Sequence, residues 1–163
     1  MVQEILMIIT LASIWICLVM QIFTLSGAID FWLKHSTKVI KITPLPRYPM
    51  ITIVVPAHNE EVVIAQTTRA ILDMNYPADR VELLLYADNC ADKTVDEMRR
   101  VLADPRYRSR NVKIIERTGS GAKAGVLNDA LKIAHGDYIG VYDADAMPET
   151  NALYFLVRKA LEN

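Results

Sequence analysis

The first apolar stretch of the chain runs from Ile5 to Leu25 without a charged residue. A helix rises about 1.5 Å per residue, so this stretch would span roughly 30 Å, the thickness of a membrane's hydrocarbon core. A cleaved signal peptide normally has basic residues before its apolar run, but here only Glu4 is charged there. A buried core helix would normally show a polar face. The pattern therefore predicts a retained transmembrane helix, with its interface, over residues 1–30.

Basic residues follow this run, whereas no Lys or Arg precedes it; they are Lys34, His35, Lys38, Lys41 and Arg47. Positive charge marks the cytoplasmic flank of a membrane helix. We therefore predict a single-pass membrane protein with residues 31–163 in the cytoplasm. The same charges can contact anionic membrane lipids. Prolines are frequent in residues 43–49, which indicates that residues 31–48 form a basic, Pro-rich juxtamembrane linker.

The remainder of the chain alternates short apolar runs with stretches of helical period. Strands are expected at 51–55, 81–86, 112–115 and 138–142, and helices at 60–74, 92–102, 122–134 and 149–161. This alternation predicts an α/β fold whose parallel strands are joined by right-handed crossovers. Because the strands are almost continuously apolar, we expect both faces of each to be buried, including Tyr138–Tyr142.

Composition excludes several classes of function. The formal net charge of −1 gives no basic character that would indicate a nucleic-acid partner. The two cysteines, Cys17 and Cys90, form neither a disulfide framework nor a metal-binding spacing. A reduced compartment is the simplest inference for the soluble part.

Polar side chains collect where the predicted strands end: Glu60 after the first, Asp88 after the second, Lys123 after the third, and Asp143 and Asp145 after the fourth. The carboxyl ends of parallel strands lie on one edge of the sheet, where open α/β sheets bind ligands. Two carboxylates one residue apart supply the hard oxygen ligands that Mg²⁺ or Mn²⁺ prefers. Together these residues predict a nucleotide-diphosphate pocket with a metal site.

Each residue also has a structural interpretation. Glu60 can cap the first helix, His58 and Cys90 can be ordinary loop residues, and the pair of acids at Asp143 can form an Asp-rich turn. For Asp92 the N-cap interpretation is favoured. The helix that follows can begin at Asp92 or at Thr94, where Glu97 would complete a capping box.

Three glycines, Gly119, Gly121 and Gly125, have the spacing G-x-G-x-x-x-G. A dinucleotide fingerprint requires G-x-G-x-x-G, and a P-loop requires a following G-K-[ST]. A dinucleotide-binding reductase, which would bind NADH and ignore Mn²⁺, is therefore a weak alternative.

Four motifs closely resemble those of the family 2 glycosyltransferases with the GT-A fold. They are Pro56-Ala-His-Asn-Glu60, Asp88-Asn-Cys-Ala-Asp-Lys-Thr94, Lys123-Ala-Gly-Val-Leu-Asn128 and Asp143-Ala-Asp145, in the order of the family. The resemblance implies a GT-A (Rossmann-like) nucleotide-sugar-binding half-domain over residues 49–163, incomplete at its C-terminus.

The resemblance also implies roles for individual residues. Uridine would be held by the loop that contains Pro56, Ala57, His58 and Glu60, and its base by Asp88. Lys123 and Arg117 would face the base or the diphosphate. Asp143 would bind the nucleotide-sugar side, and Asp145, with Asp143, the metal. The family often has two adjacent acids where this chain has Asp88-Asn89, which leaves the contact to the base open.

The reaction implied by the resemblance is inverting transfer of a sugar from a UDP-sugar to a polysaccharide or glycolipid acceptor. The catalytic base of the family lies in a later segment, and Glu149 cannot be assigned that role. We therefore expect a donor half that requires a C-terminal half, or another subunit, and that does not transfer sugar alone. The rival from another class is a membrane-anchored nucleotide-binding or assembly module without turnover.

The basic flank generates a topology prediction. A reporter fused after residue 163 should be active only on the cytoplasmic side, because positive residues follow the apolar run and none precedes it. A paired alkaline phosphatase and fluorescent-protein fusion measures the side directly. Phosphatase activity outside the cytoplasm would contradict the orientation.

Overall fold

A computed structural model describes residues 1–35, 42–120 and 122–162 of the chain. The chain divides into two compact units, Met1–Pro44 and Leu45–Asn163. Of the residues used in the predictions above, Lys38, Lys41 and Gly121 lie outside the described part.

The N-terminal unit contains one long helix, α1 (Val2–His35). Within residues 1–35, 42–120 and 122–162 it is the one helix long and apolar enough to cross a membrane, with a mean hydropathy of 2.5. Its apolar side chains are exposed on all sides, as lipid contact requires and as a soluble core helix would not be. The predicted membrane-helix candidate is therefore present, and it is longer than Ile5–Leu25.

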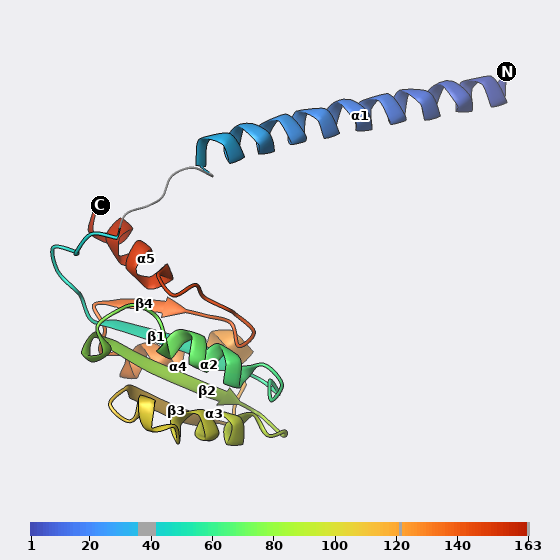
Figure 1. The fold of residues 1–163 in the computed structure, drawn as a ribbon. Coiled ribbons are helices and arrows are strands. Elements are labelled where there is room, and N and C mark those ends of the chain that lie inside the picture. Colours follow the sequence, from blue (N-terminus) through green and yellow to red (C-terminus); the bar gives the residue numbers. More distant parts are fainter. Residues whose placement is uncertain (36–41, 121, 163) are drawn as a thin grey trace. The chain divides into compact units, whose positions relative to one another are not determined.

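The second unit is built on a parallel sheet, as predicted (Figure 1). Its strands are β1 (Ile51–Ala57), β2 (Val81–Asp88), β3 (Asn111–Arg117) and β4 (Tyr138–Val141), in the order β3-β2-β1-β4. The register pairs Ala57 with Ala87 and Asp88 with Arg117, so the carboxyl ends of β1, β2 and β3 are level. Polar residues that follow these strands are thereby brought to one edge.

Helices cover both faces of this sheet: α2 (Ile64–Leu72), α3 (Thr94–Leu102), α4 (Ala122–Ile133) and α5 (Ala152–Leu161). Short 3₁₀ turns, η1 (Ala78–Arg80) and η2 (Pro105–Tyr107), precede β2 and β3. Side chains of a strand alternate between faces. Ile53, Val55, Leu83 and Leu85 accordingly pack with α2, α3 and α5, whereas Val54, Leu84 and Tyr86 pack with α4. The near-continuous apolar character of β1 and β2 thus reflects burial on both faces.

The prediction that every strand is buried on both faces was wrong for the two outer strands of the described sheet, β3 and β4, in which no residue is buried. Tyr138, Ile139 and Val141 are 37–43% exposed, and β4 ends before Tyr142. The physical reason is position: β4 is an edge strand of the described sheet, paired only with β1. Sequence composition does not distinguish an apolar edge strand from a central one.

Two predicted helix starts were too early. The stretch before α2 is a turn that follows Asn59, whose backbone angle φ of 56° is left-handed, and α2 begins only at Ile64. The last helix begins at Ala152 rather than Glu149. The helix after β2 begins at Thr94, one of the two predicted starts, but without a side-chain cap bond from its N-cap residue Lys93.

A buried carboxylate stabilises the opposite, amino-terminal edge of the sheet. Glu82, 1% exposed, accepts hydrogen bonds from Thr52 Oγ1 at 2.8 Å, Lys113 Nζ at 3.1 Å, and the backbone N–H and Nδ1 of His135, both at 3.0 Å. A carboxylate only accepts, so Nδ1 of His135 carries a proton. Burial acts to raise the pKa of Glu82, but these hydrogen bonds outweigh it and lower the pKa to about 2.

This carboxylate predicts an acid-dependent stability. Because its pKa is lower in the folded state, the free energy of unfolding should fall as pH decreases from about 4.5 to about 2. Glu82→Gln should lose that part of the pH dependence and destabilise the fold at neutral pH by up to roughly 3 kcal/mol. Thermal unfolding of the full chain in detergent, followed by circular dichroism between pH 3 and 7, measures both effects.

The control is Glu116→Gln, since the Glu116 side chain is exposed and pairs with Arg99 at the surface. This variant should keep the acid-dependent slope of the parent. Identical pH profiles for Glu82→Gln and the parent would contradict the account.

Candidate functional site

A cavity of about 490 Å³ opens at the carboxyl ends of the strands. It is lined by the ends of β1 and β2 with the residues after them, by the loop after β3 and the first turns of α4, and by one residue after β4. These residues are Pro56, Ala57, His58, Glu60, Asp88, Asn89, Gly119, Ser120, Ala122, Lys123, Val126 and Asp143. All the predicted sugar-nucleotide residues except Arg117 line it, and of the predicted metal ligands Asp143 does and Asp145 does not. The structure therefore brings the four predicted strand ends around one pocket.

Two opposite charges meet across this pocket. Lys123 in the first turn of α4 donates through Nζ to Oδ1 of Asp143, which follows β4. Their side chains are 53% and 63% exposed, so water screens the pair and its contribution to stability is small. Both groups can therefore exchange this contact for a ligand.

The predicted metal site consists of Asp143 and Asp145, both exposed. Among the described residues no group of three or more His, Cys, Asp or Glu side chains could hold a metal ion. Two carboxylates are nevertheless a fitting partial donor set for Mg²⁺ or Mn²⁺, because such ions take further oxygens from phosphates and water. The residues present fit a metal held jointly with a diphosphate.

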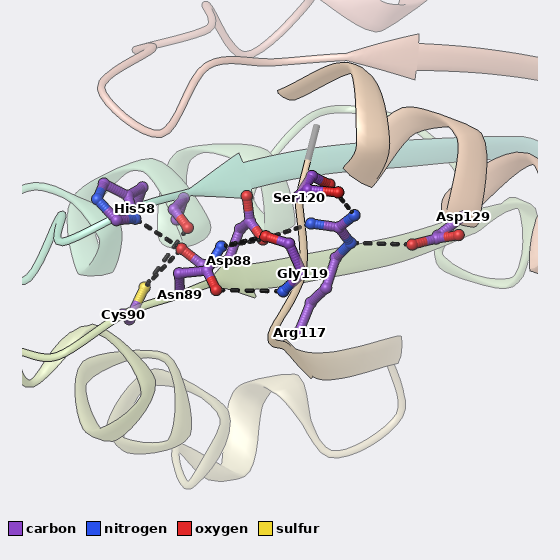
Figure 2. Close-up of polar contacts among 9 residues, drawn as sticks. His58, Asp88, Asn89, Cys90, Arg117, Gly119, Ser120 and Asp129 are labelled. Carbon is purple, nitrogen blue, oxygen red and sulfur yellow. Dashed lines mark hydrogen bonds and ion pairs between the residues drawn. The ribbon is translucent and has the colours of Figure 1, made fainter. Parts of the chain in front are cut away.

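Arg117 lies beside the pocket and is not among the residues that line it, so its predicted contact with the base or the diphosphate stays a prediction. Figure 2 shows its guanidinium between two carboxylates: Nη1 donates to Oδ1 of Asp88 at 2.7 Å, and Nε donates to Oδ2 of Asp129 at 2.9 Å. Hydrogen bonding to Asp129 and then Asp88 raises the pKa of Arg117 further above its usual value. The side chain is thus a fixed cation beneath the site.

Sequence reasoning gave no role to several pocket residues, above all to the Asn89 side chain. Its Nδ2 donates to Asp88 Oδ1 at 3.1 Å and to the Gly119 carbonyl at 2.9 Å, while its Oδ1 accepts from the Gly119 N–H at 3.2 Å. Asn89 adopts a φ of 51°, a left-handed conformation that Asn tolerates better than most residues. The signal that could have found it is an Asn directly after a strand.

Ser120, Ala122 and Val126 also line the pocket without having been predicted to do so. They belong to the loop after β3 and to α4, and their types carry no chemical signal. His58 does line the pocket, where its Nδ1 donates to the Asp88 carbonyl at 2.7 Å. This bond leaves Nε2 as the acceptor of the ring.

The loops after β1 and β2 are joined by Thr94 and Asp92. Thr94 Oγ1 accepts from the Glu60 N–H at 2.8 Å and donates to Asp92 Oδ1 at 2.6 Å. The other oxygen of Asp92 accepts from the Glu61 N–H at 3.1 Å. Slight desolvation acts to raise the pKa of Asp92, but these hydrogen bonds lower it. Asp92 therefore has a structural role and fixes the backbone that carries Glu60. It is not the N-cap residue that was favoured above, because Lys93 occupies the N-cap position of α3.

Comparison with known proteins agrees with this geometry. The model of the family described as Glycosyl transferase family 2 matches residues 52–163. A probable glycosyltransferase, YdaM, of Bacillus subtilis is 34% identical over 151 residues, which cover 91% of this chain and 36% of YdaM. The beta-monoglucosyldiacylglycerol synthase of Synechocystis is 37% identical over 101 residues, which cover 61% of this chain and 20% of that enzyme.

Solved structures show the same fold. The mannosyltransferase PcManGT from Pyrobaculum calidifontis, in complex with GDP-Man and Mn²⁺, aligns with a TM-score of 0.65 and 30% identity over 79% of this chain. S. aureus TarS in complex with UDP-GlcNAc aligns with a TM-score of 0.61 and 23% identity over 69% of this chain, which supports the fold alone. The chain spans 36% of the PcManGT chain and 31% of the TarS 1-349 chain.

These matches exclude the dinucleotide-binding reductase considered above. They agree with the parallel sheet, the alternating helices and the pocket at the strand ends. The chain belongs to Glycosyl transferase family 2 and has the GT-A fold.

Proposed function

We propose that this chain binds a UDP-sugar in the pocket at the strand ends and serves inverting transfer of the sugar to a polysaccharide or glycolipid acceptor. The observation that carries the proposal is the convergence of Asp88, Lys123 and Asp143 on one cavity. Asp88 is an acceptor suited to the base of such a donor, and Lys123 is a cation suited to its diphosphate. Asp143 is an acid suited to the metal that accompanies the diphosphate.

The roles follow from charge and position. Asp88 accepts a hydrogen bond from the base, and the loop that contains Pro56, Ala57, His58 and Glu60 surrounds the uridine. Lys123 exchanges Asp143 for the diphosphate, since the diphosphate carries more negative charge than one solvated carboxylate. Among these residues none is assigned as the catalytic base.

Asp145 and Asp143, together with the diphosphate of the donor, would hold the metal, Mg²⁺ or Mn²⁺. When bound, it supplies Lewis-acid stabilisation of the charge on the departing UDP. PcManGT was solved with GDP-Man and Mn²⁺, which supports the metal and leaves the base to be tested.

The acceptor class rests on relatives. The cyanobacterial relative is named as a beta-monoglucosyldiacylglycerol synthase, and an Arabidopsis relative as a glucomannan 4-beta-mannosyltransferase. Together with α1, these names support a membrane-associated acceptor of the glycolipid or polysaccharide type. In this proposal α1 spans the membrane once and residues 31–163 lie on the cytoplasmic side, where they meet the UDP-sugar.

The alternative is a membrane-anchored nucleotide-binding module without turnover. It is favoured because the acidic residues that line the pocket, Glu60, Asp88 and Asp143, all have donor-binding roles in this proposal. Both functions require sugar-nucleotide binding, so they separate only in a transfer assay that includes the further segment or subunit expected to supply the base.

Metal-dependent binding tests the proposal. The full chain in detergent should bind UDP at least tenfold more tightly with Mn²⁺ than with EDTA, because the cation neutralises the diphosphate. Asp145→Asn should remove most of that difference, since an amide oxygen carries no charge. Isothermal titration calorimetry measures both affinities.

Asp96→Asn is the matched control, because Asp96 is exposed on α3 away from the pocket. It should keep the metal effect of the parent. Equal UDP affinity with and without Mn²⁺ would reject the metal assignment. Tighter binding of GDP than of UDP would reject uracil as the base.

A further inference from the structure

The end of β3 carries a side chain that joins three parts of the candidate site. Arg117 is the last residue of β3 and pairs in register with Asp88, the last residue of β2. Its side chain is only 14% exposed, and that of Asp88 is 8% exposed. Besides its bonds to Asp88 and Asp129, its Nη2 donates to the Ser120 carbonyl at 2.6 Å. Each of the three guanidinium nitrogens thus contacts a different element (Figure 2).

The helix beside the guanidinium leaves space for it. A Cβ atom at Gly125 of α4 would lie 2.5 Å from Arg117 Nη2 and 2.7 Å from the Ser120 carbonyl oxygen. A Cβ at Gly119 would lie 3.2 Å from Arg117 Cζ. Any side chain at position 125 would therefore displace either the guanidinium or the loop. Gly119 and Gly125 thus leave room for the packing of an arginine.

The two oxygens of Asp88 have different environments. Oδ1 accepts from Arg117 Nη1 at 2.7 Å and from Asn89 Nδ2 at 3.1 Å. Oδ2 accepts no hydrogen bond from any residue that the structure describes. Since Asp88 lines the pocket, Oδ2 is the oxygen left for a ligand. The carboxylate is held at one end and available at the other.

We propose that Arg117 is a positioning residue for base selection: it locks Asp88 so that Oδ2 presents a fixed acceptor to the ring N–H of uracil. This inference rests on the proposed function. Uracil carries a hydrogen on N3, whereas cytosine has a lone pair there, which a fixed carboxylate repels. A mobile carboxylate could instead turn toward the exocyclic amino group of cytosine. Fixing Asp88 therefore creates the discrimination between the two pyrimidines.

The test compares UDP with CDP on the full chain in detergent with Mn²⁺, by calorimetry. The parent should bind UDP about a hundredfold more tightly than CDP. With CDP, the buried Asp88 carboxylate would lose its hydrogen-bond partner on the base. Arg117→Lys keeps the charge but cannot span three acceptors. Gly125→Ala keeps the arginine but displaces it. Both variants should weaken UDP binding by about tenfold and reduce the preference over CDP by a similar factor.

Lys132→Met is the matched control. Lys132 is exposed, and its substitution removes only the ion pair that Asp129 makes besides the one with Arg117. It should keep the preference of the parent. Thermal unfolding identifies a variant that does not fold, and two independent variants keep the test decisive.

The outcomes separate the two claims. If both folded variants retain the parent's ratio of UDP to CDP affinity, even with weaker binding, Arg117 has only a structural role and the inference is overturned. If the parent binds no nucleoside diphosphate, the proposed function fails, and this role fails with it.

Discussion

Parallel pairing of β2 with β1 and β3 is the constraint on which the rest of the second unit depends. Because β1, β2 and β3 end level with one another, the segments that follow them meet at one edge. The same register places Arg117 beside Asp88. A shift by one residue would turn these side chains to the opposite face. The backbone pairing of the strands therefore determines which side chains meet in the pocket.

The buried carboxylates at the two edges of the sheet differ in how fully they are hydrogen-bonded. At the amino-terminal edge, Glu82 has all its hydrogen-bonding capacity satisfied within the protein, which makes that edge a stabilising element. At the carboxyl edge, Asp88 is held through one oxygen only, and Lys123 and Asp143 pair in solvent. The carboxyl edge can bind a ligand because some of its polar groups keep hydrogen-bonding capacity. The amino-terminal edge stabilises the fold because Glu82 has none left.

Much of this arrangement could be predicted from sequence, and the failures have physical causes. Strand–helix alternation was enough to place Glu60, Asp88, Lys123 and Asp143 at one edge. It could not give the strand order, so the exposure of β4 and the pairing of Arg117 with Asp88 were missed. The start of α2 was misplaced in the turn that follows Asn59, a residue with a left-handed conformation. Such local backbone geometry is not encoded in the hydrophobic period.

The central claim is that the strand ends form one pocket for a nucleoside diphosphate and its metal. A crystal structure of the full chain with UDP and Mn²⁺, with anomalous data for manganese, tests it most directly. The account predicts a manganese peak within coordination distance of Asp145 and the uracil ring against Asp88. Manganese away from both carboxylates of Asp143-Ala-Asp145, or UDP bound outside the pocket, would contradict it.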